Sequence, residues 1–334
     1  MKTGITVFGN LFVDSVKIVD TFPKEGMLAN ITGQRRGVGG CVSNTSICLA
    51  RLAPELPVSA AGFIGQDEAG DYLRGCLHQE GIETAWVKNI PGWSTGFTDV
   101  ISSEKTKTRT FFNYRSANSV YGFDDIPFAE INTRRFHMGY ALLLDQFDKA
   151  DPEYGTVIAR ALSAVQQKGI RTSIDVVSED GDRFLQVVEP SLKYCDDVII
   201  NKIEGGRIAG IDSRDTQGSL KKESLSEICA ALLKKGVANS VIIHCPEYGC
   251  MMTNNGDFVC LSSLPLPSGY TKGMVGAGDA FCAGAVLGLY YGFPPKETLK
   301  LAICTAGANL ASEDSVSGIL NLEQVKKTEK YFKE

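Results

Sequence analysis

Short apolar segments alternate along this chain with longer segments in which apolar residues recur at helical spacing. The short segments predict buried strands, and the longer segments predict helices. The expected strands are Ile5–Gly9, Val58–Gly65, Trp86–Ile90, Phe136–Gly139, Thr172–Val177, Val198–Ile200 and Ser240–His244. The expected helices are Asn44–Leu52, Gln66–Leu77, Tyr154–Lys168, Phe184–Lys193, Ser224–Lys235, Ala280–Tyr291 and Lys296–Glu313. This alternation predicts an α/β fold with helices on both faces of a mostly parallel sheet.

Other segments alternate apolar and polar residues, which is typical of half-buried strands. Thr98–Ile101 and Thr108–Tyr114 flank a polar tip and predict a hairpin. Together with Val16–Thr21 they could form a small accessory sheet. A second hairpin is expected from Cys250–Thr253 and Phe258–Leu261, across an Asn-Asn-Gly-Asp turn.

The composition is typical of a soluble globular protein and serves mainly to exclude some function classes. Of the 334 residues, 43% are hydrophobic and 22% are charged, and the net charge of −5 predicts no nucleic-acid or membrane partner. No apolar run reaches membrane-spanning length, and the N-terminus lacks the apolar core of a signal peptide. Ten irregularly spaced cysteines and three scattered histidines match no zinc motif. We therefore expect free thiols and a cytoplasmic location.

A Gly-Ala-Gly turn, Gly276–Gly278, stands directly before Asp279 and the expected helix Ala280–Tyr291. Such a turn aims unpaired N–H groups and the positive end of the helix dipole at one point, which suits a phosphate. The Asp279 carboxylate at the same turn could take a proton from a substrate hydroxyl. An anion cradle and a base are the minimum machinery for phosphoryl transfer. The alternative is a purely structural motif, a glycine-rich turn in which the Asp only caps the helix.

Polar residues near two other predicted elements could bind a substrate. Asn10 and Asp14 follow the first strand, at the end where open α/β sheets form their ligand crevice. Gly39 and Gly40 precede the helix that carries Asn44, and glycine allows a ligand to approach the backbone closely. The Asn44 amide could bond sugar hydroxyls, although a turn with an Asn near its cap would look the same.

Five motifs in this order resemble the ribokinase-like (PfkB) family of carbohydrate and nucleoside kinases. They are Gly9-Asn10 with Asp14, Gly39-Gly40 with Asn44, Gly62–Gly70, Asn201-Lys202-Ile203-Glu204, and Gly276–Phe281. Their separations are similar to those of the family over essentially the whole chain. The resemblance implies a central α/β domain of residues 1–10, 37–94 and 118–334, with a small β lid made of the inserted residues 11–36 and 95–117.

The resemblance also implies ATP-dependent phosphorylation of a primary alcohol with Mg²⁺. Asp279 would be the catalytic base, and the N–H groups of Gly276, Ala277 and Gly278 would be the anion hole. Glu204 and Asn201 would organise Mg²⁺ and its waters. The residues implied for the substrate are Asn10, Asp14, Gly39, Gly40 and Asn44, and those implied near the nucleotide are Asn201, Glu204, His244, Gly249 and Asn309.

The substrate could be a sugar or a nucleoside. Tyr114 and Arg115 lie where lid residues would reach it, and Asp145 lies near a position where some sugar kinases carry an acid. An Arg there could recognise an acidic sugar such as 2-keto-3-deoxygluconate, and Tyr114 or Phe112 could stack on a nucleobase. A small apolar lid could also pair with a second copy as a homodimer. A non-catalytic sugar or nucleotide sensor is a further alternative.

Three segments depart from the family pattern. Gly273-Met274-Val275 replaces an Asp-Thr-Thr segment, so a carboxylate tied to monovalent-cation binding in many relatives is missing. Pro246 falls in a segment that is usually Thr-x-Gly-x-x-Gly, and it has no N–H to donate to a phosphate. Asp175–Glu179 replaces a frequent Asp-x-Asn-x-Arg segment. These departures predict an altered grip on the nucleotide and cast doubt on activation by potassium.

Overall fold

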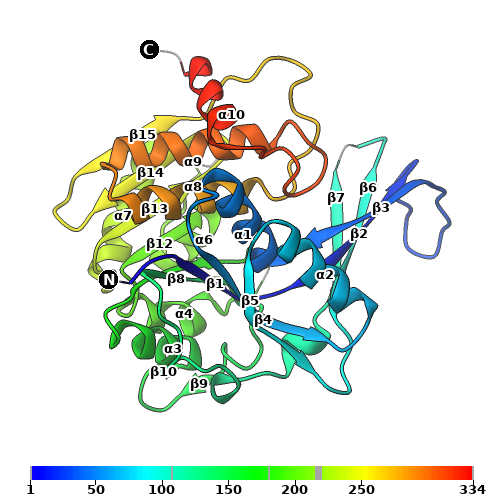
Figure 1. Cartoon of the computed structure of the whole chain (residues 1–334). Helices are drawn as coiled ribbons and strands as arrows, with labels where there is room; N and C mark the ends of the chain where they lie inside the picture. Colours follow the sequence, from blue (N-terminus) through cyan, green and yellow to red (C-terminus); the bar gives the residue numbers. More distant parts are fainter. Residues whose placement is uncertain (1, 107, 180, 215–219, 333–334) are drawn as a thin grey trace.

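The computed structural model describes residues 2–106, 108–179, 181–214 and 220–332. Its centre is a nine-stranded sheet in the order β15-β14-β13-β12-β11-β8-β1-β4-β5 (Figure 1). The strands are β1 Ile5–Phe8, β4 Val58–Gly65, β5 Glu83–Ile90, β8 Arg135–Ala141, β11 Arg171–Val176, β12 Asp197–Asn201, β13 Ser240–His244, β14 Tyr248–Thr253 and β15 Phe258–Ser262. All neighbouring strands from β13 to β5 pair in parallel, while β14 and β15 add an antiparallel hairpin at one edge. The predicted α/β fold is confirmed.

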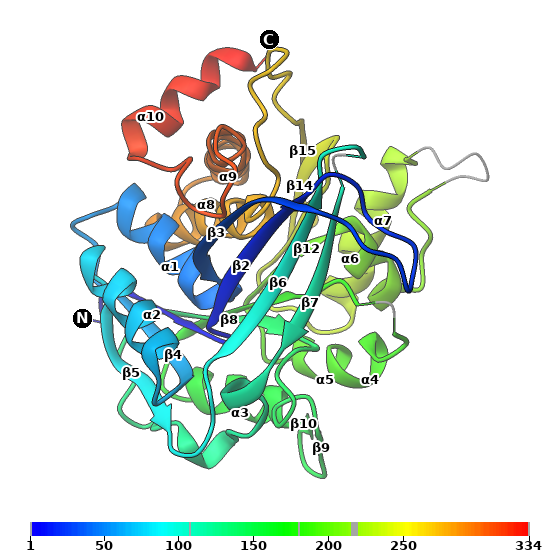
Figure 2. The ribbon, with the colours of Figure 1, turned by 90° about the vertical axis from the view of Figure 1, so that its right-hand side faces the viewer.

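Helices cover both faces of this sheet and bury two hydrophobic clusters (Figure 2). One face carries α1 Gly40–Leu52, α2 Glu68–Gln79, α8 Ala277–Tyr291, α9 Pro295–Asn309 and α10 Leu322–Lys327. The other carries α3 Val157–Gln166, α4 Phe184–Val187, α5 Glu189–Leu192, α6 Lys202–Ala209 and α7 Lys222–Lys234. A two-stranded ribbon, β9 Ala150–Asp151 and β10 Gly155–Thr156, lies outside the main sheet.

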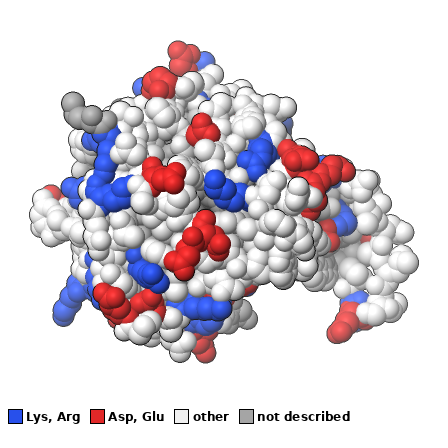
Figure 3. Space-filling model, turned by 60° about the horizontal axis from the view of Figure 1, so that its bottom comes forward, with Lys and Arg blue, Asp and Glu red and all other residues white. Residues whose placement is uncertain are grey.

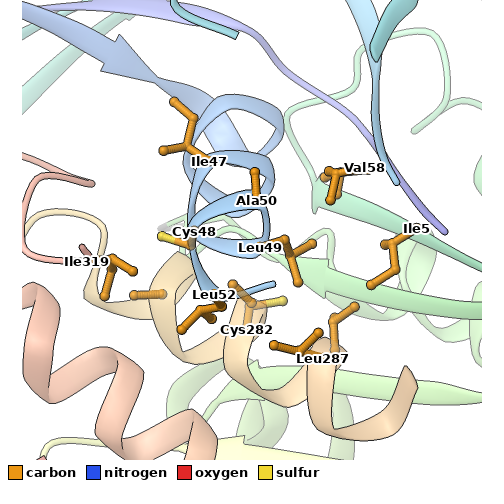
Figure 4. Close-up of a cluster of buried hydrophobic side chains, with 14 of the residues drawn as sticks. Ile5, Ile47, Cys48, Leu49, Ala50, Leu52, Val58, Cys282, Leu287 and Ile319 are labelled. Carbon is orange, nitrogen blue, oxygen red and sulfur yellow. The ribbon is translucent and has the colours of Figure 1, made fainter. Parts of the chain in front are cut away.

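Helix α8 is apolar on nearly every side because it is enclosed by α1, α9 and the sheet. Figure 4 shows side chains of α1, among them Leu49 and Leu52, in one cluster with Cys282 and Leu287 of α8. Full burial of one leucine side chain stabilises a fold by roughly 1.5–3 kcal/mol. The first turn of α8 is therefore held rigidly at the end of the sheet.

A separate four-stranded sheet projects from one side of the main body (Figure 1). Its order is β3-β2-β6-β7, with β2 Phe12–Val19, β3 Ile31–Gly39, β6 Gly96–Ser103 and β7 Arg109–Tyr114. Because β2 and β6 pair in parallel and the other pairs are antiparallel, the sheet is mixed. We call this sheet the lid. Asp14 pairs with Thr98, and Thr98 with Asn113, so these side chains share one face.

Several predicted elements differ from the structure for local reasons. Strand β3 was not expected because Ile31–Gly39 is polar and glycine-rich. The expected helix Phe184–Lys193 is two short helices, and Pro190 stands in the first turn of the second, where its missing N–H is tolerated. The expected helix Lys296–Glu313 ends at Asn309. The expectation that every cysteine is free was wrong, because Cys250 and Cys260 form a disulfide between β14 and β15.

Charged side chains of both signs are interspersed on the face shown in Figure 3. Within the described ranges, no helix combines the length and apolar character needed to cross a membrane.

Candidate active site

The first turn of α8 faces a cavity beside the lid. Gly276 precedes the helix with a left-handed backbone of φ 72°, and a Cβ there would lie 2.3 Å from the Ser315 carbonyl oxygen. Only glycine fits this position. No side chain caps the helix, and among the described residues the only acceptor for its first three N–H groups is the Met274 carbonyl, which lies 3.4 Å from the Ala277 nitrogen. The predicted anion-binding turn is therefore a helix N-terminus that opens on a cavity.

Asp279 lies in that turn, and its side chain lines the cavity. The Asn44 amide and the Tyr140 hydroxyl both donate hydrogen bonds to Asp279 Oδ2, at 2.8 and 3.0 Å. Burial and the charge of Asp175 raise the pKa of Asp279 to about 7, while the two hydrogen bonds act to lower it. A base performs best with a pKa near the working pH, so this environment suits proton abstraction near neutrality.

The cavity has a volume of about 460 Å³ and lies between the lid and the carboxyl ends of the parallel strands. Asp14, Thr98 and Asn113 line it from the lid. Other described residues that line it are Phe12, Gly40, Asn44, Phe111, Tyr140, Leu143, Asp175, Val176, Val177, Ser178, Ile199, Asn201, Glu204, His244, Met274, Val275, Gly276, Gly278 and Cys282. The crevice expected at the strand ends is therefore present, as is usual for open α/β sheets.

Asp14 contacts the backbone of the second glycine cluster. A Cβ on Gly39 would lie 2.1 Å from Asp14 Oδ1, so the carboxylate can take this place only because residue 39 is glycine. Burial and the negative charge of Asp279 raise the pKa of Asp14 to about 7, while a hydrogen bond with Thr98 lowers it. Asn113 donates a second hydrogen bond to Thr98. Asp14 is thus held in place and ready to accept hydrogen bonds from a ligand.

Asn201 and Glu204 form a reciprocal cap at the start of α6. The Asn201 side chain accepts from the backbone N–H groups of Ile203 and Glu204, and Glu204 Oε2 accepts from the Asn201 N–H at 2.8 Å. Ser178 donates to Glu204 Oε1 at 2.7 Å. Burial raises the pKa of Glu204 to about 8. Carboxylate, amide and hydroxyl oxygens are the donors that Mg²⁺ prefers, so this group could hold the ion through water.

A second cavity of about 420 Å³ adjoins the first and shares Asn201, His244, Met274 and Gly278 with it. Its other walls are mostly apolar and include Leu264, Phe281, Ile303, Ala306 and Leu310. Burial lowers the pKa of His244 to about 4, so its ring is neutral and brings no positive charge to this junction. Two connected cavities meet at the N-terminus of α8, which is the arrangement that transfer between two bound molecules needs.

Comparison with known proteins identifies the family. The family model described as pfkB family carbohydrate kinase matches residues 2–320. The chain belongs to this family. It is a phosphotransferase that acts on a sugar hydroxyl, as expected from its five motifs.

Individual relatives of this kinase are distant in sequence. A ribokinase of Haemophilus influenzae is 23% identical over 325 residues, which cover 96% of each chain. The solved structure of Arabidopsis thaliana ribokinase, complexed with ribose and ATP, has a TM-score of 0.79 and 19% identity and covers 99% of this chain and 100% of that one. A 2-dehydro-3-deoxygluconokinase from Thermotoga maritima has a TM-score of 0.77 and 18% identity, with 97% and 98% covered. At these identities the solved structures show a shared fold.

Arg115, Asp145 and Tyr114, predicted at the substrate, do not line the cavity of this kinase. The guanidinium of Arg115 forms an ion pair with Asp145 instead of remaining free for a ligand. Tyr114 is paired with Phe97, and their rings lie 5.4 Å apart on the lid face opposite Asn113. The expected stacking of a nucleobase on Tyr114 or Phe112 therefore has no support, because strand alternation turns both rings away from the cavity.

Four further predicted residues do not line either cavity. Gly39 is one of them, and it makes room for the Asp14 carboxylate. The Asn10 amide donates to the Leu143 carbonyl at 3.2 Å, and the Asn309 amide donates to the Val275 carbonyl at 2.8 Å. Gly249 packs against Ile303 and Phe281. Each of the other three positions backbone next to a cavity.

Several cavity residues were not expected from the sequence. Tyr140 lies near the end of β8 and Leu143 follows that strand, and the apolar pattern gives no reason to single them out. Phe12 stands outside the strands expected from the sequence, and Phe111 belongs to the expected hairpin without a role at the site. The alternation of β7 could have identified Phe111, since it shares a face with Asn113. Tyr140 has no such signal, because its reach to Asp279 joins segments 139 residues apart.

Proposed function

We propose that this kinase transfers the γ-phosphoryl group of ATP to a primary hydroxyl of a sugar. Asp279 takes the proton of the hydroxyl while the hydroxyl oxygen forms a bond to the γ-phosphorus and the bond to ADP breaks. The N–H groups of Gly276, Ala277 and Gly278 receive the developing negative charge. The observation that carries this proposal is a cavity-lining carboxylate of raised pKa beside the uncapped N-terminus of α8.

ATP would occupy the second cavity, with its base among the apolar side chains and its phosphates towards Gly278. Asn201, Ser178 and Glu204 would hold Mg²⁺ through water, and the ion would neutralise phosphate charge. We propose no monovalent-cation requirement, because Gly273 takes the place of the family's usual carboxylate. A Cβ at Gly273 would lie 2.7 Å from the Ser312 carbonyl oxygen, so the packing there is already complete.

A neutral sugar such as ribose or fructose suits the cavity better than a sugar acid. Among the described residues that line it, four are acids (Asp14, Asp175, Glu204, Asp279) and none is Lys or Arg. Arg115, the cation expected to recognise an acid group, is paired with Asp145. A substrate carboxylate would meet a cluster of acidic groups without a counter-ion, whereas neutral hydroxyl groups can form hydrogen bonds with them.

A nucleoside is the second candidate, and the aromatic rings of Phe12 and Phe111 in the cavity wall favour it. An aromatic face can pack against a nucleobase. A turnover screen with Mg-ATP distinguishes the candidates. Sugar kinase activity predicts ADP release with free pentoses or hexoses, whereas nucleoside kinase activity predicts turnover of adenosine, inosine or cytidine while free sugars are inert. No product with either group would contradict the proposed function.

We also propose a homodimer through the lid. Phe97, Phe112 and Tyr114 are 40%, 56% and 50% exposed, and they share the face that points away from the cavity. Strand β7 is also a free edge of the lid sheet within the described residues. An exposed aromatic face beside an open sheet edge is a suitable surface for a second copy.

A further inference from the structure

Tyr140 and Asn44 both bind the same oxygen of Asp279. Their donors reach Oδ2, and no described residue donates a hydrogen bond to Oδ1. A carboxylate whose one oxygen is held by two fixed donors cannot rotate freely about its side-chain bonds. The other oxygen is then presented to the cavity in one orientation.

The backbone that carries Tyr140 is strained. Tyr140 has φ 59° and Leu142 has φ 82°, and a left-handed conformation is costly for residues other than glycine. A strained position of this kind persists only when surrounding contacts enforce it.

Polar contacts enforce this turn from several sides. Asp175 Oδ1 accepts from the Tyr140 N–H, and Asp148 Oδ1 accepts from the Leu142 N–H at 3.1 Å. Arg183 donates to the Leu142 carbonyl at 2.8 Å. The chain thus uses two carboxylates and a guanidinium to keep the Tyr140 ring over the cavity.

We propose that Tyr140 is a positioning residue for the base: its hydroxyl holds Oδ2 of Asp279 so that Oδ1 faces the substrate hydroxyl. This inference rests on the proposed function and adds a residue to it. In the reaction, the substrate proton moves to Oδ1, while Oδ2 keeps its two donors and Tyr140 keeps its own proton. The tyrosine therefore acts through Asp279 and needs no contact with the phosphoryl group.

Other titratable groups lie near Asp279, and their titration must be distinguished from the titration of Asp279. They are Asp14 of β2, Cys41 and Cys48 of α1, His137 of β8, Asp175 of β11, His244 of β13 and Cys282 of α8. Burial raises the pKa of the Cys41 and Cys282 thiols well above their usual range. The pKa of Asp14 is about 7, so this group titrates in the same range as Asp279.

The test is the pH dependence of Tyr140→Phe, which removes the hydroxyl and keeps the ring. Hydrogen bonds to a carboxylate lower its pKa, so the acid limb of kcat should move to higher pH by about one unit. At pH values below the acid limb, kcat of the variant should be about 10–100-fold lower than kcat of the unmodified protein, which corresponds to the loss of one hydrogen bond to a charged group. KM for the sugar should change less than about 3-fold. Part of the lost rate should return at alkaline pH.

Tyr121→Phe is a matched control, because the Tyr121 hydroxyl is buried without a hydrogen-bond partner among the described residues. It should leave kcat and the pH profile unchanged. Replacement of Tyr140 by 3-fluorotyrosine, a stronger donor of similar shape, should move the acid limb to lower pH. An unchanged profile in Tyr140→Phe, or a higher KM with normal kcat, would overturn the proposal.

A ¹³C NMR titration of aspartate carboxyl groups needs no substrate. It therefore tests the role of Tyr140 even if the proposed sugar substrate is wrong. Asp148 also has a raised pKa, of about 6, so spectra of Asp279→Asn and Asp14→Asn are needed to assign the signals of these two residues. The Asp279 signal should titrate about one unit higher in Tyr140→Phe than in the unmodified protein. Loss of turnover with an unmoved titration would overturn the role of Tyr140. If Tyr140→Phe does not fold, the protein with 3-fluorotyrosine at position 140 decides the question. A lower titration pH of the Asp279 signal would support the proposal, and an unchanged titration pH would overturn it.

Discussion

The negative charge of Asp279 raises the pKa of Asp14, which lines the same cavity. Burial contributes most of this rise, and together the two effects bring the pKa of Asp14 from 3.8 to about 7. Repulsion between these two carboxylates is unfavourable in the free protein, and hydrogen-bond donors on a bound sugar would offset it. This pair therefore links the stability of the fold to its proposed function.

Asp14→Asn should stabilise the fold at pH 8. The folded pKa is raised above the unfolded value, so between about pH 4 and 7 the folded state binds more protons, and stability falls as pH rises through this window. The uncharged amide of the Asp14→Asn variant does not ionise, so this loss of stability with rising pH is absent. We expect a gain on the order of 1 kcal/mol or more at pH 8, little gain at pH 4, and an increased KM for the sugar. Thermal unfolding at both pH values checks this, and a lower melting temperature at pH 8 would contradict it.

Asp145→Asn should weaken the discrimination against sugar acids. The substitution breaks the ion pair that neutralises Arg115, near the end of the lid strand that carries Asn113. A released guanidinium can bind a substrate carboxylate, and one charge-assisted hydrogen bond corresponds to about tenfold or more in kcat/KM. The measurement is kcat/KM for a sugar and for its aldonic acid.

Asp99→Asn is the matched control for this prediction. It breaks the ion pair between Asp99 and Lys17, also in the lid, and neither residue lines the cavity. The preference for the neutral sugar should stay unchanged in this control. A preference that is equally strong in Asp145→Asn would mean that Arg115 has no influence on substrate choice.

Glu204 should make the Mg²⁺ requirement depend on pH. Burial raises its pKa to about 8, so below this pH the carboxyl group holds a proton that ion binding must displace. The Mg²⁺ concentration for half-maximal turnover should fall as pH rises through about 8. Glu204→Gln should abolish this dependence and lower kcat. In Glu179→Gln, which alters a neighbouring acid paired with Arg183, the dependence should remain.

The proposed dimer depends on the outer face of the lid. Phe112→Asp places a charge among Phe97, Phe112 and Tyr114 and should convert the dimer to a monomer in analytical ultracentrifugation. Leu185→Asp, at a residue of α4 that is 50% exposed and outside the lid, should leave the mass unchanged. A monomeric unmodified protein at all concentrations would end the proposal.

The main fold follows from the sequence because its strands are short, buried and apolar, as Ile5–Phe8 illustrates. The glycine turn at Gly276 was also predictable, since a helix start of this kind needs special backbone geometry. Strand β3 was not predictable from its polar residues alone, because its stability comes from pairing with β2.

Apart from the positions that the family resemblance implied, the site was predictable only where a role is local. Asn201 and Glu204 are three residues apart and contact each other through a capping box. Tyr140 and Asp279 are 139 residues apart and meet only through the folded sheet, and the pairing of Arg115 with Asp145 also joins distant segments, 30 residues apart. Arg115 was therefore expected to be free, and Tyr140 was not singled out.

The central claim is that Asp279 accepts the proton of the substrate hydroxyl. The most direct test is kcat of Asp279→Asn with Mg-ATP and a sugar that the unmodified protein phosphorylates, together with calorimetric binding of both substrates. The account predicts that kcat falls by about 10²–10⁴-fold while both substrates still bind and the fold is at least as stable. A variant that turns over within about threefold of the unmodified protein would contradict the account.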